Sequence, residues 1–278
     1  VGASVIEGAF SETGGESGRD RINAGQTQFL CQNREGYHNL GYLVSLSYTE
    51  GKVDGVPCVN HQLLEKYHSG LIALSGGMNG EISRHFLAGR PDDARRVAMW
   101  YRDVFVDRYY IELQNTGLPE QTELNTQLIG LGHELGIPLV ATNDCFYLTP
   151  EEAEAQYILW LMGQQRRVTD DEVPLQSGNQ RYLKSADEML SAFKELPLAA
   201  LENTSKIAEQ CELTLENKKI FLPQIPTKED ETVDSKLSDD AKKGLEKRIT
   251  KLYELYAPEV SFEEFKQPYT ERLSFELE

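Results

Sequence analysis

The sequence has little positive charge to balance its negative charge. It carries 28 Lys and Arg residues against 45 Asp and Glu residues, which gives a formal net charge of −17 at pH 7. A surface this acidic repels phosphate backbones and releases few counterions on contact with them. The composition therefore argues against non-specific nucleic-acid binding by this chain, and any contact with DNA would be local or belong to another domain.

Cysteine is also scarce, and long apolar runs are absent. The four cysteines are too far apart for a Cys-x-x-Cys metal or redox motif and too few for a disulfide framework, so reduced thiols in the cytoplasm are expected. No apolar run approaches the roughly 20 residues of a membrane-spanning helix. Residues 1–6 lack an initiator Met and a basic signal-peptide segment, and they predict a start inside a strand of a longer protein.

What is present is the composition of a folded globule, with 40% hydrophobic residues over 278 positions. Short apolar strands alternate with longer helical patterns, which predicts βα units and a parallel sheet or barrel with helices outside. Functional sites on such folds lie where the strands end, here at residues 75–80, 114–117 and 142–146. Strands are predicted at 1–6, 26–32, 71–74, 109–113 and 138–141, and helices after Asn33, from Glu81, over 91–105 and 119–135, and after capping boxes at Thr149 and Ser185.

The composition and the pattern of the sequence change after about Leu213. An extended segment with two prolines covers 217–226, and a highly charged linker is predicted over 227–240. An amphipathic helix follows over 241–256, with apolar side chains on one face. We therefore predict a domain boundary here, with one domain at 1–213 and a second element at 214–278.

The loop at residues 75–80 joins a predicted strand to a predicted helix and is rich in glycine. Its backbone N–H groups could hold an anion such as phosphate. However, the loop has neither the GxGxxG spacing of a dinucleotide site nor the Lys-Ser or Lys-Thr pair of a Walker loop. A tight turn between strand and helix is the favoured interpretation.

Asp144 and Cys145 directly follow a predicted buried strand. Asp144 could be a metal ligand or a general base, or its side chain could form an Asx turn or a cap. Cys145 could be a nucleophile if a base lay nearby, but a buried structural thiol is favoured because the sequence supplies no such base. The five histidines fall in or beside helical segments with charged neighbours, and we expect them to lie on the surface: His38, His61, His68, His85 and His133.

Several short motifs follow one another in a distinctive order along the chain. They are Glu35-Gly36-Tyr37-His38-Asn39-Leu40, Gly70-Leu71-Ile72-Ala73-Leu74-Ser75-Gly76, Thr116-Gly117-Leu118-Pro119-Glu120, Pro138-Leu139-Val140-Ala141-Thr142-Asn143-Asp144, Tyr182-Leu183-Lys184-Ser185, Leu201-Glu202-Asn203-Thr204, Ile207-Ala208-Glu209-Gln210-Cys211 and Phe221-Leu222-Pro223. These segments resemble the PHP (polymerase and histidinol phosphatase) domain of the bacterial replicative DNA polymerase III alpha subunit. The similarity covers nearly the whole chain.

The resemblance implies an α/β fold, an incomplete distorted (β/α)7 PHP barrel followed by a mainly helical start of the polymerase palm. The family's amino-terminal ligands and the downstream catalytic aspartates of the polymerase lie outside this sequence. In metal-bearing members, ligands collect at the barrel mouth. At the corresponding positions this sequence has Ser4, Gln26 and Gly77, and the Asp-x-His pair keeps Asp144 but has Phe146 in place of the His.

One carboxylate cannot hold a cluster of ions, because each ion needs several donors. We therefore predict no metal, no other cofactor and no catalytic residue in this segment. The resemblance implies a segment of the polymerizing subunit, a DNA-directed DNA polymerase that uses Mg in its complete form. The segment itself would be a structural module that docks the proofreading exonuclease, while the sliding clamp and DNA would bind to downstream domains.

Two other functions remain open. The first is a stand-alone metal-dependent PHP phosphoesterase, which predicts a His-rich mouth and does not account for the residues after Pro223. The second is a pure scaffold with no enzymatic parent. Under each hypothesis we expect a cytoplasmic protein with no membrane contact.

Overall fold

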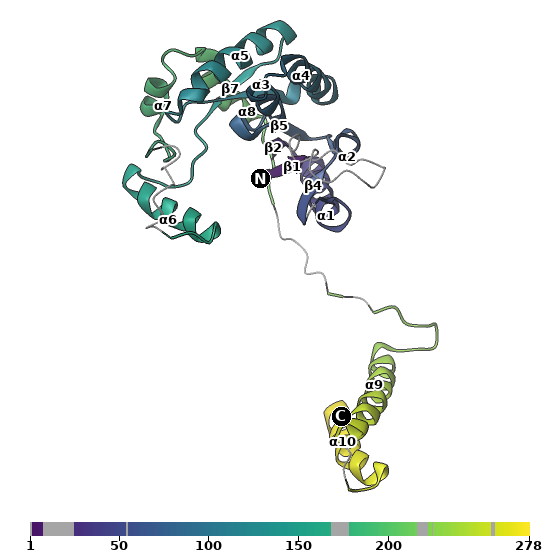
Figure 1. The fold of residues 1–278 in the computed structure, drawn as a ribbon. Coiled ribbons are helices and arrows are strands. Elements are labelled where there is room, and N and C mark those ends of the chain that lie inside the picture. Colours follow the sequence, from purple (N-terminus) through teal and green to yellow (C-terminus); the bar gives the residue numbers. More distant parts are fainter. Residues whose placement is uncertain are drawn as a thin grey trace. The chain divides into compact units, whose positions relative to one another are not determined.

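The computed structural model describes residues 2–7, 25–53, 55–167, 178–215, 222–223, 225–256 and 259–278. The chain divides into two compact units, Val1–Leu215 and Glu216–Glu278. Each unit is described by itself (Figure 1). The first unit is a mixed α/β structure built on one sheet, and the second is a pair of helices.

The sheet has seven strands in the order β3-β4-β1-β2-β5-β6-β7. The predicted parallel arrangement holds for β5, β6 and β7, and for β1 with β4. It is wrong for β2, which runs antiparallel to both of its neighbours, because side-chain periodicity does not encode the direction in which a strand enters a sheet. The strands are β1 (Gly2–Glu7), β2 (Gly25–Cys31), β3 (Lys52–Val53), β4 (Val56–Val59), β5 (Leu71–Leu74), β6 (Tyr109–Gln114) and β7 (Leu139–Thr142).

The helices of the first unit begin and end largely where their capping residues predict. Asn33 accepts a hydrogen bond from the Gly36 N–H, Gly136 takes the left-handed conformation after α5, and capping boxes form at Thr149 and Ser185. The helices are α1 (Arg34–Thr49), α2 (His61–Tyr67), α3 (Glu81–Leu87), α4 (Pro91–Phe105), α5 (Pro119–Leu135), α6 (Ala153–Gly163), α7 (Ala186–Ala192) and α8 (Leu198–Glu209).

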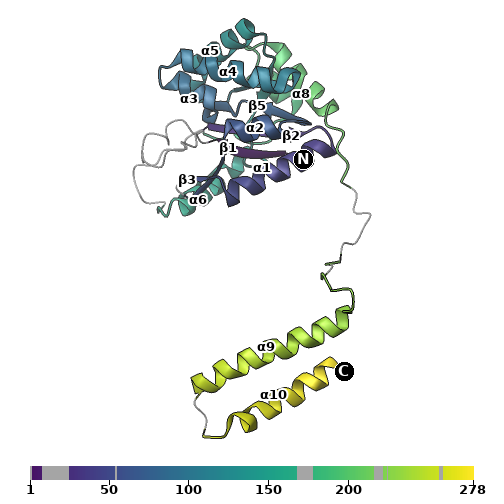
Figure 2. The same ribbon diagram turned by 90° about the vertical axis from the view of Figure 1, so that its right-hand side faces the viewer.

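The core forms on both faces of the sheet. On one face, aromatic side chains of β2, α4 and β6 stack, with the Tyr101 and Tyr109 ring centroids 4.8 Å apart. On the other face, Ile207 of α8 packs among apolar residues of β5, β6 and β7. Helices α3, α4 and α5 lie together over the sheet in both ribbon views (Figures 1 and 2). Burial on both faces explains why β5 is a continuous apolar run and why β6 is mostly apolar.

The second unit consists of α9 (Val233–Tyr256) and α10 (Phe262–Leu277). The predicted charged linker over 227–240 is wrong from Val233 onward, where the structure is already helical. Val233, Leu237 and Leu245 recur at intervals of four or eight residues, so they extend the apolar stripe of the predicted helix among solvated charged side chains. In the part of the chain that the structure describes, no helix is both long enough and apolar enough to cross a membrane.

Candidate functional site

The candidate site lies where β5, β6 and β7 end side by side. The three strands are parallel, so their carboxyl ends meet at one edge of the sheet. The glycine-rich turn follows β5, Gln114 ends β6, and Thr142 ends β7. The structure therefore brings together the three strand-end segments that the sequence predicts.

Glu112 of β6 is at the centre of this edge, and its side chain is 1% exposed. Its carboxylate accepts hydrogen bonds from the Gly76 N–H at 3.0 Å, from the Gln114 amide at 3.0 Å and from the Thr142 hydroxyl. The backbone N–H of Glu112 donates to the Ser75 hydroxyl at 2.9 Å. We call these five residues the Glu112 network, and it links all three strand ends.

Burial raises the pKa of Glu112 above its ordinary value, although the hydrogen bonds from Thr142, Gln114 and Gly76 act in the opposite direction. Sequence analysis missed this residue. A signal was present, because Glu112 interrupts the otherwise apolar run of β6. A charged side chain at a fully buried strand position requires hydrogen-bonding partners, so the position was a candidate on that ground alone.

Asp144 lies just beyond β7, as predicted, and pairs with a cation. Its carboxylate accepts a hydrogen bond from the guanidinium of Arg181, and both side chains are about a quarter exposed, at 26% and 27%. The guanidinium carbon also lies 4.7 Å from the centre of the Phe146 ring. Sequence reasoning found Asp144 and Phe146 but not Arg181, which is 37 residues away along the chain.

Two further contacts hold Arg181 in this place. The Phe146 N–H donates to the Arg181 carbonyl at 2.9 Å, and the Arg181 N–H donates to the Tyr147 hydroxyl at 3.1 Å. These two hydrogen bonds hold the backbone of Arg181 beside Phe146 and Tyr147, and so keep its side chain close to Asp144. We call Asp144, Phe146 and Arg181 the Asp144–Arg181 cluster.

The glycine-rich turn packs tightly against its neighbours. A Cβ at Gly77 would lie 2.4 Å from the Gln114 amide, and the backbone of Gly77 is left-handed, with φ at 56°. A Cβ at Gly76 would lie 1.5 Å from the carbonyl oxygen of Gln26. The Gln114 side chain therefore fills the space that a larger residue at position 77 would use, and the turn donates a hydrogen bond to Glu112 of the same chain.

Two predicted positions belong to the strands beside this turn. Gln26 lies in β2, where it pairs with Ile6, and its backbone reaches the turn at Gly76. Ser4 lies in β1, opposite Gln28, and its side chain is outside the described residues. The structure thus brings Gln26, Gly77 and Gln114 to one edge of the sheet.

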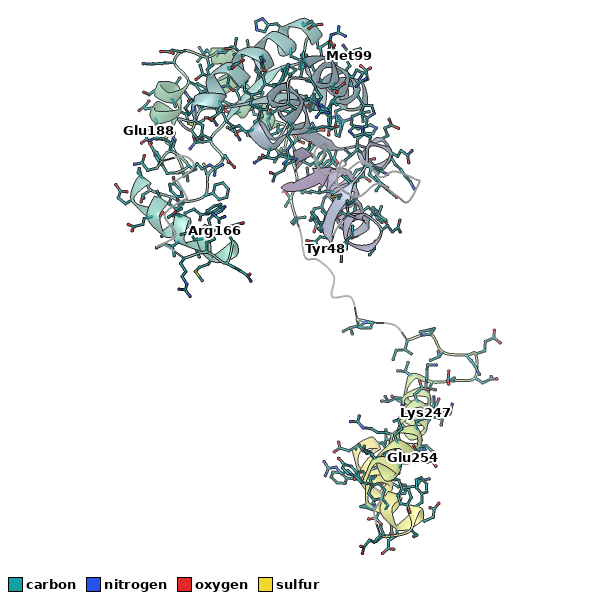
Figure 3. All side chains as sticks on the ribbon, viewed as in Figure 1. Tyr48, Met99, Arg166, Glu188, Lys247 and Glu254 are labelled. Atoms are coloured by element: carbon teal, nitrogen blue, oxygen red, sulfur yellow. The ribbon has the colours of Figure 1, made fainter. Side chains whose placement is uncertain are left out.

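Asn143 connects the strand end to the segment before α7. Its amide donates to the carbonyls of Gln180 at 3.0 Å and Tyr182 at 2.6 Å, and its oxygen accepts from the Lys184 ammonium at 3.1 Å. Burial lowers the pKa of Lys184. Glu188, labelled in Figure 3, follows this segment and accepts a hydrogen bond from the Tyr182 hydroxyl at 2.8 Å. The contacts of Asn143 with residues 180–184 therefore position Arg181 next to Asp144.

The expectation of a buried thiol at Cys145 is wrong, because Cys145 is exposed. It lies in the loop after β7 rather than in the strand, so the sheet does not cover it. The expectation of surface histidines is wrong for His85, which lies in α3 and is only 7% exposed. His61 stacks on Trp100 with ring centroids 3.9 Å apart and pairs with Glu81 at 3.1 Å.

The donor set of the described residues does not fit a PHP metal cluster. Within the part of the chain that the structure describes, no three His, Cys, Asp or Glu side chains are grouped so that they could share an ion. Asp144 is paired with Arg181, and Glu112 already accepts three hydrogen bonds. The two carboxylates at this edge are thus satisfied by groups of the protein itself.

Comparison with known proteins agrees with this architecture. The family profile of the PHP domain matches residues 7–116. The chain is 34% identical to the DNA polymerase III subunit alpha of Pseudomonas fluorescens over 249 residues, which are 90% of this chain and 21% of the relative. Residues 7–116 thus match a PHP domain, and 90% of the chain is similar to DNA polymerase III alpha subunits.

Other curated relatives carry the same name. The DNA polymerase III subunit alpha of Escherichia coli (strain K12) is 34% identical over 250 residues, which are 90% of this chain and 21% of the relative. That of Borreliella burgdorferi is 40% identical over 183 residues, which are 66% of this chain and 16% of the relative. The chain spans about a fifth of the length of the relatives that match 90% of it.

Proposed function

We propose that this chain is a segment of the alpha subunit of a bacterial DNA polymerase III, which carries out template-directed DNA synthesis in chromosome replication. The relatives that match 90% of the chain at 34% identity support this assignment. In this proposal Val1–Leu215 corresponds to most of a distorted (β/α)7 PHP barrel, and α9 and α10 enter the palm. The complete polymerase uses Mg and contacts DNA and the sliding clamp through other domains.

Within that subunit, the segment acts as a metal-free PHP module with no catalytic residue. The Asp144–Arg181 cluster is the observation that supports the metal-free state most directly. Asp144 is the carboxylate that the resemblance assigns to a metal, and its oxygen accepts from the Arg181 guanidinium instead. Phe146, at the position of the lost His, lies under the same guanidinium. A fixed positive side chain thus supplies the charge that an ion would supply elsewhere in the family.

The glycine-rich turn supports the same conclusion. Residue 77 is at the position of a Cys ligand in the resemblance, and here the Gln114 side chain occupies the space beside it. Restoring one ligand at Gly77 would therefore displace Gln114 from Glu112. This packing of Gln114 against Gly77 supports a metal-free edge of the sheet.

The alternative is a metal-dependent phosphoesterase, which is favoured by the presence of two carboxylates, Glu112 and Asp144, near the ends of neighbouring strands. A phosphodiesterase assay with an aryl phosphodiester and added Mn²⁺ separates the two functions. We expect no hydrolysis above the rate of the Asp144→Asn variant. Metal-dependent hydrolysis that the Asp144→Asn variant loses would favour the phosphoesterase.

The module's proposed role is to dock the proofreading exonuclease. A negatively charged surface suits a protein partner better than DNA, and the net charge of the chain is −17. The test is co-purification of the exonuclease with the complete polymerase subunit and with the same subunit lacking residues 1–215. The role requires loss of the exonuclease on deletion. Equal recovery with both would contradict it.

The polymerase assignment is tested by primer extension with the complete polypeptide that contains this sequence. We expect Mg-dependent extension by the complete polypeptide and none by residues 1–278 alone. A polypeptide that contains this sequence and extends no primer would contradict the assignment.

A further inference from the structure

Helix α1 presents an uncharged side to solvent in a chain that is otherwise rich in charge. Residues 36–49 contain no Asp, Glu, Lys or Arg, although 26% of all residues in the chain are charged. Tyr37, Tyr42 and Tyr48 are 39%, 58% and 59% exposed. The solvent side of a helix usually carries charged residues, so this side of α1 is suited to contact with a partner. We call Gly41, Ser45, which are also exposed, and these three tyrosines the α1 surface.

The α1 surface is a strip of small residues with tyrosines on both sides. Successive residues of a helix are turned by about 100°, so Tyr37 and Tyr48 point to nearly the same side and Tyr42 points more than about 100° away from them. Gly41 and Ser45 lie between these two directions. The Ser45 hydroxyl donates to the Gly41 carbonyl at 2.8 Å, and a Cβ added at Gly41 would meet nothing within 4 Å. The space above the strip is therefore open.

Neighbouring rings hold two of these tyrosines in place. Tyr42 stacks on Tyr67 of α2, with ring centroids 5.6 Å apart and 23° between the ring planes. The Tyr37 ring meets the His38 ring edge-on at 6.0 Å. Helix α1 lies at the outside of the first unit in both ribbon views (Figures 1 and 2), and Tyr48 is labelled in Figure 3. Aromatic rings that are already ordered lose little conformational entropy when a partner binds.

The spacing of the tyrosines along α1 indicates the conformation of the partner. A helix rises by about 1.5 Å per residue, so Tyr42 and Tyr48 are about 9 Å apart along the axis, and Tyr37 and Tyr48 about 16 Å. One turn of polyproline II, which has three residues, spans about 9.3 Å. Contacts from a helical partner repeat about every 5.4 Å and those from one face of a strand about every 6.7 Å. About five residues in polyproline II would therefore cover the strip from Tyr37 to Tyr48.

Two lysines beside the α1 surface indicate the charge of the partner. The Lys52 ammonium lies 6.0 Å from the centre of the Tyr48 ring, and the Lys66 ammonium lies 5.1 Å from that of Tyr67. A partner with carboxylates beside an uncharged centre complements this arrangement. A phosphate backbone fits it less well, because residues 36–49 offer it no cation and the net charge of the chain is −17. The complementary partner is thus an extended protein segment that is uncharged at its centre and acidic at its ends.

We infer that the α1 surface binds a proline-rich segment of a partner protein, which lies in the polyproline II conformation along Gly41 and Ser45 with acidic residues near Lys52 and Lys66. Proline rings pack on exposed aromatic rings, and polyproline II is preformed in such segments, so that little entropy is lost on binding. The inference is independent of the polymerase assignment, because none of its residues belongs to the candidate site at the strand ends.

Fluorescence anisotropy with a labelled peptide tests the inference on the complete polypeptide that contains this sequence. The probe has six consecutive prolines with an aspartate at each end, and the control peptide has glycines in place of the prolines. Both peptides carry the same charge, but the glycine peptide has no preformed polyproline II structure. We expect the proline peptide to bind at least about tenfold more tightly. Equal affinity for the two peptides, or no binding of the proline peptide, would overturn the inference.

Substitutions in α1 test whether the peptide lies along the strip. The new side chain of Gly41→Leu enters open space and favours the helix, so the melting temperature should not fall. It should nevertheless block the strip and weaken binding of the proline peptide by about tenfold or more, as should Tyr42→Ala. Tyr256→Ala, at a tyrosine 65% exposed in α9, is the matched control and should bind the peptide like the wild type. Unchanged affinity in both Gly41→Leu and Tyr42→Ala would overturn the inference.

Two further measurements separate the other possible occupants of the α1 surface. In size-exclusion chromatography with light scattering, a dimer that Gly41→Leu dissociates would show that a second copy covers α1. In anisotropy titrations, binding of a labelled single-stranded oligothymidylate that Tyr42→Ala abolishes would assign the tyrosines to base stacking. Either result would overturn the inference.

Discussion

Glu112 and Asp144 are carboxylates near the ends of neighbouring strands, and the protein holds them in opposite ways. Glu112 is 1% exposed and accepts hydrogen bonds from three neutral groups. Asp144 is 26% exposed and pairs with the charged Arg181, whose guanidinium lies over Phe146. The buried carboxylate depends on local donors, whereas the exposed one depends on a distant cation. The comparison shows two ways in which the protein's own groups satisfy an acid at one edge of a sheet.

The largest effect is expected from Glu112→Ala, which removes the acceptor at the centre of the Glu112 network. The Gly76 N–H, the Gln114 amide and the Thr142 hydroxyl would lose a buried partner. Unsatisfied buried donors each cost free energy, and we expect the free energy of unfolding to fall by about 3 kcal/mol. Urea unfolding of Glu112→Ala measures this.

The control for this variant is Glu120→Ala, at an exposed position in the first turn of α5. Its free energy of unfolding should stay within about 0.5 kcal/mol of the wild-type value. Equal unfolding midpoints for the Glu112→Ala and wild-type proteins would show that the Glu112 network does not hold the strand ends together.

The next largest effect is expected from Gly77→Ala, which should push Gln114 away from Glu112. The added Cβ would lie 2.4 Å from the Gln114 amide, at a backbone φ of 56° that favours glycine. Overpacking and strain together should cost about 2 kcal/mol. Gly41→Ala in α1, where nothing lies within 4 Å of the new Cβ, should instead stabilise the protein by up to about 1 kcal/mol. If urea unfolding showed that both variants change the free energy of unfolding in the same direction, the packing around Gly77 would be contradicted.

The pH dependence of stability should report the burial of Glu112. Burial raises the pKa of Glu112 above its ordinary value of 4.5, so the folded state holds the proton more tightly than the unfolded state does. The free energy of unfolding should therefore fall as pH rises from about 4.5 through the folded pKa. Glu112→Gln removes this titration, and its stability should decline less than that of the wild type between acid and neutral pH. Thermal unfolding at several pH values measures this. If the stability of the wild type and of Glu112→Gln changed in parallel with pH, the raised pKa of Glu112 would be contradicted.

The smallest effect is expected from the ion pair. Asp144 and Arg181 are both partly exposed, so a double-mutant cycle with Asp144→Asn and Arg181→Met should give a coupling energy of about 0.5 kcal/mol. The coupling should shrink in high salt, because ions screen partly exposed charges. The Glu112→Ala effect should change little under the same conditions. A coupling that salt does not affect would remove the distinction between the two carboxylates.

The sequence predicts much of the fold because its strand and helix boundaries are chemically marked. Asn33, Gly136 and Ser185 occupy the cap positions that they predict, and the buried strands read as apolar runs. The antiparallel direction of β2 and the short β3–β4 pair escaped prediction. They depend on contacts between distant segments, and strands of two and four residues give too little periodicity to recognise.

The candidate site was predictable only in part, for a similar reason. The strand end at Asp144 follows from local sequence, and so does the anomaly of a charged residue in the apolar strand β6. The pairing of Asp144 with Arg181 spans 37 residues, and a second contact between the same two segments joins Asn143 to Lys184. No local pattern encodes that pairing.

Metal content of the purified protein tests the central claim most directly, namely that Arg181 and not an ion holds Asp144. Residues 1–278 would be produced in medium supplemented with zinc and manganese, dialysed, and analysed by inductively coupled plasma mass spectrometry. The account predicts metal far below one ion per chain, in the wild type and in Asp144→Asn alike. Stoichiometric zinc or manganese that survives dialysis in the wild type and is lost in Asp144→Asn would contradict it.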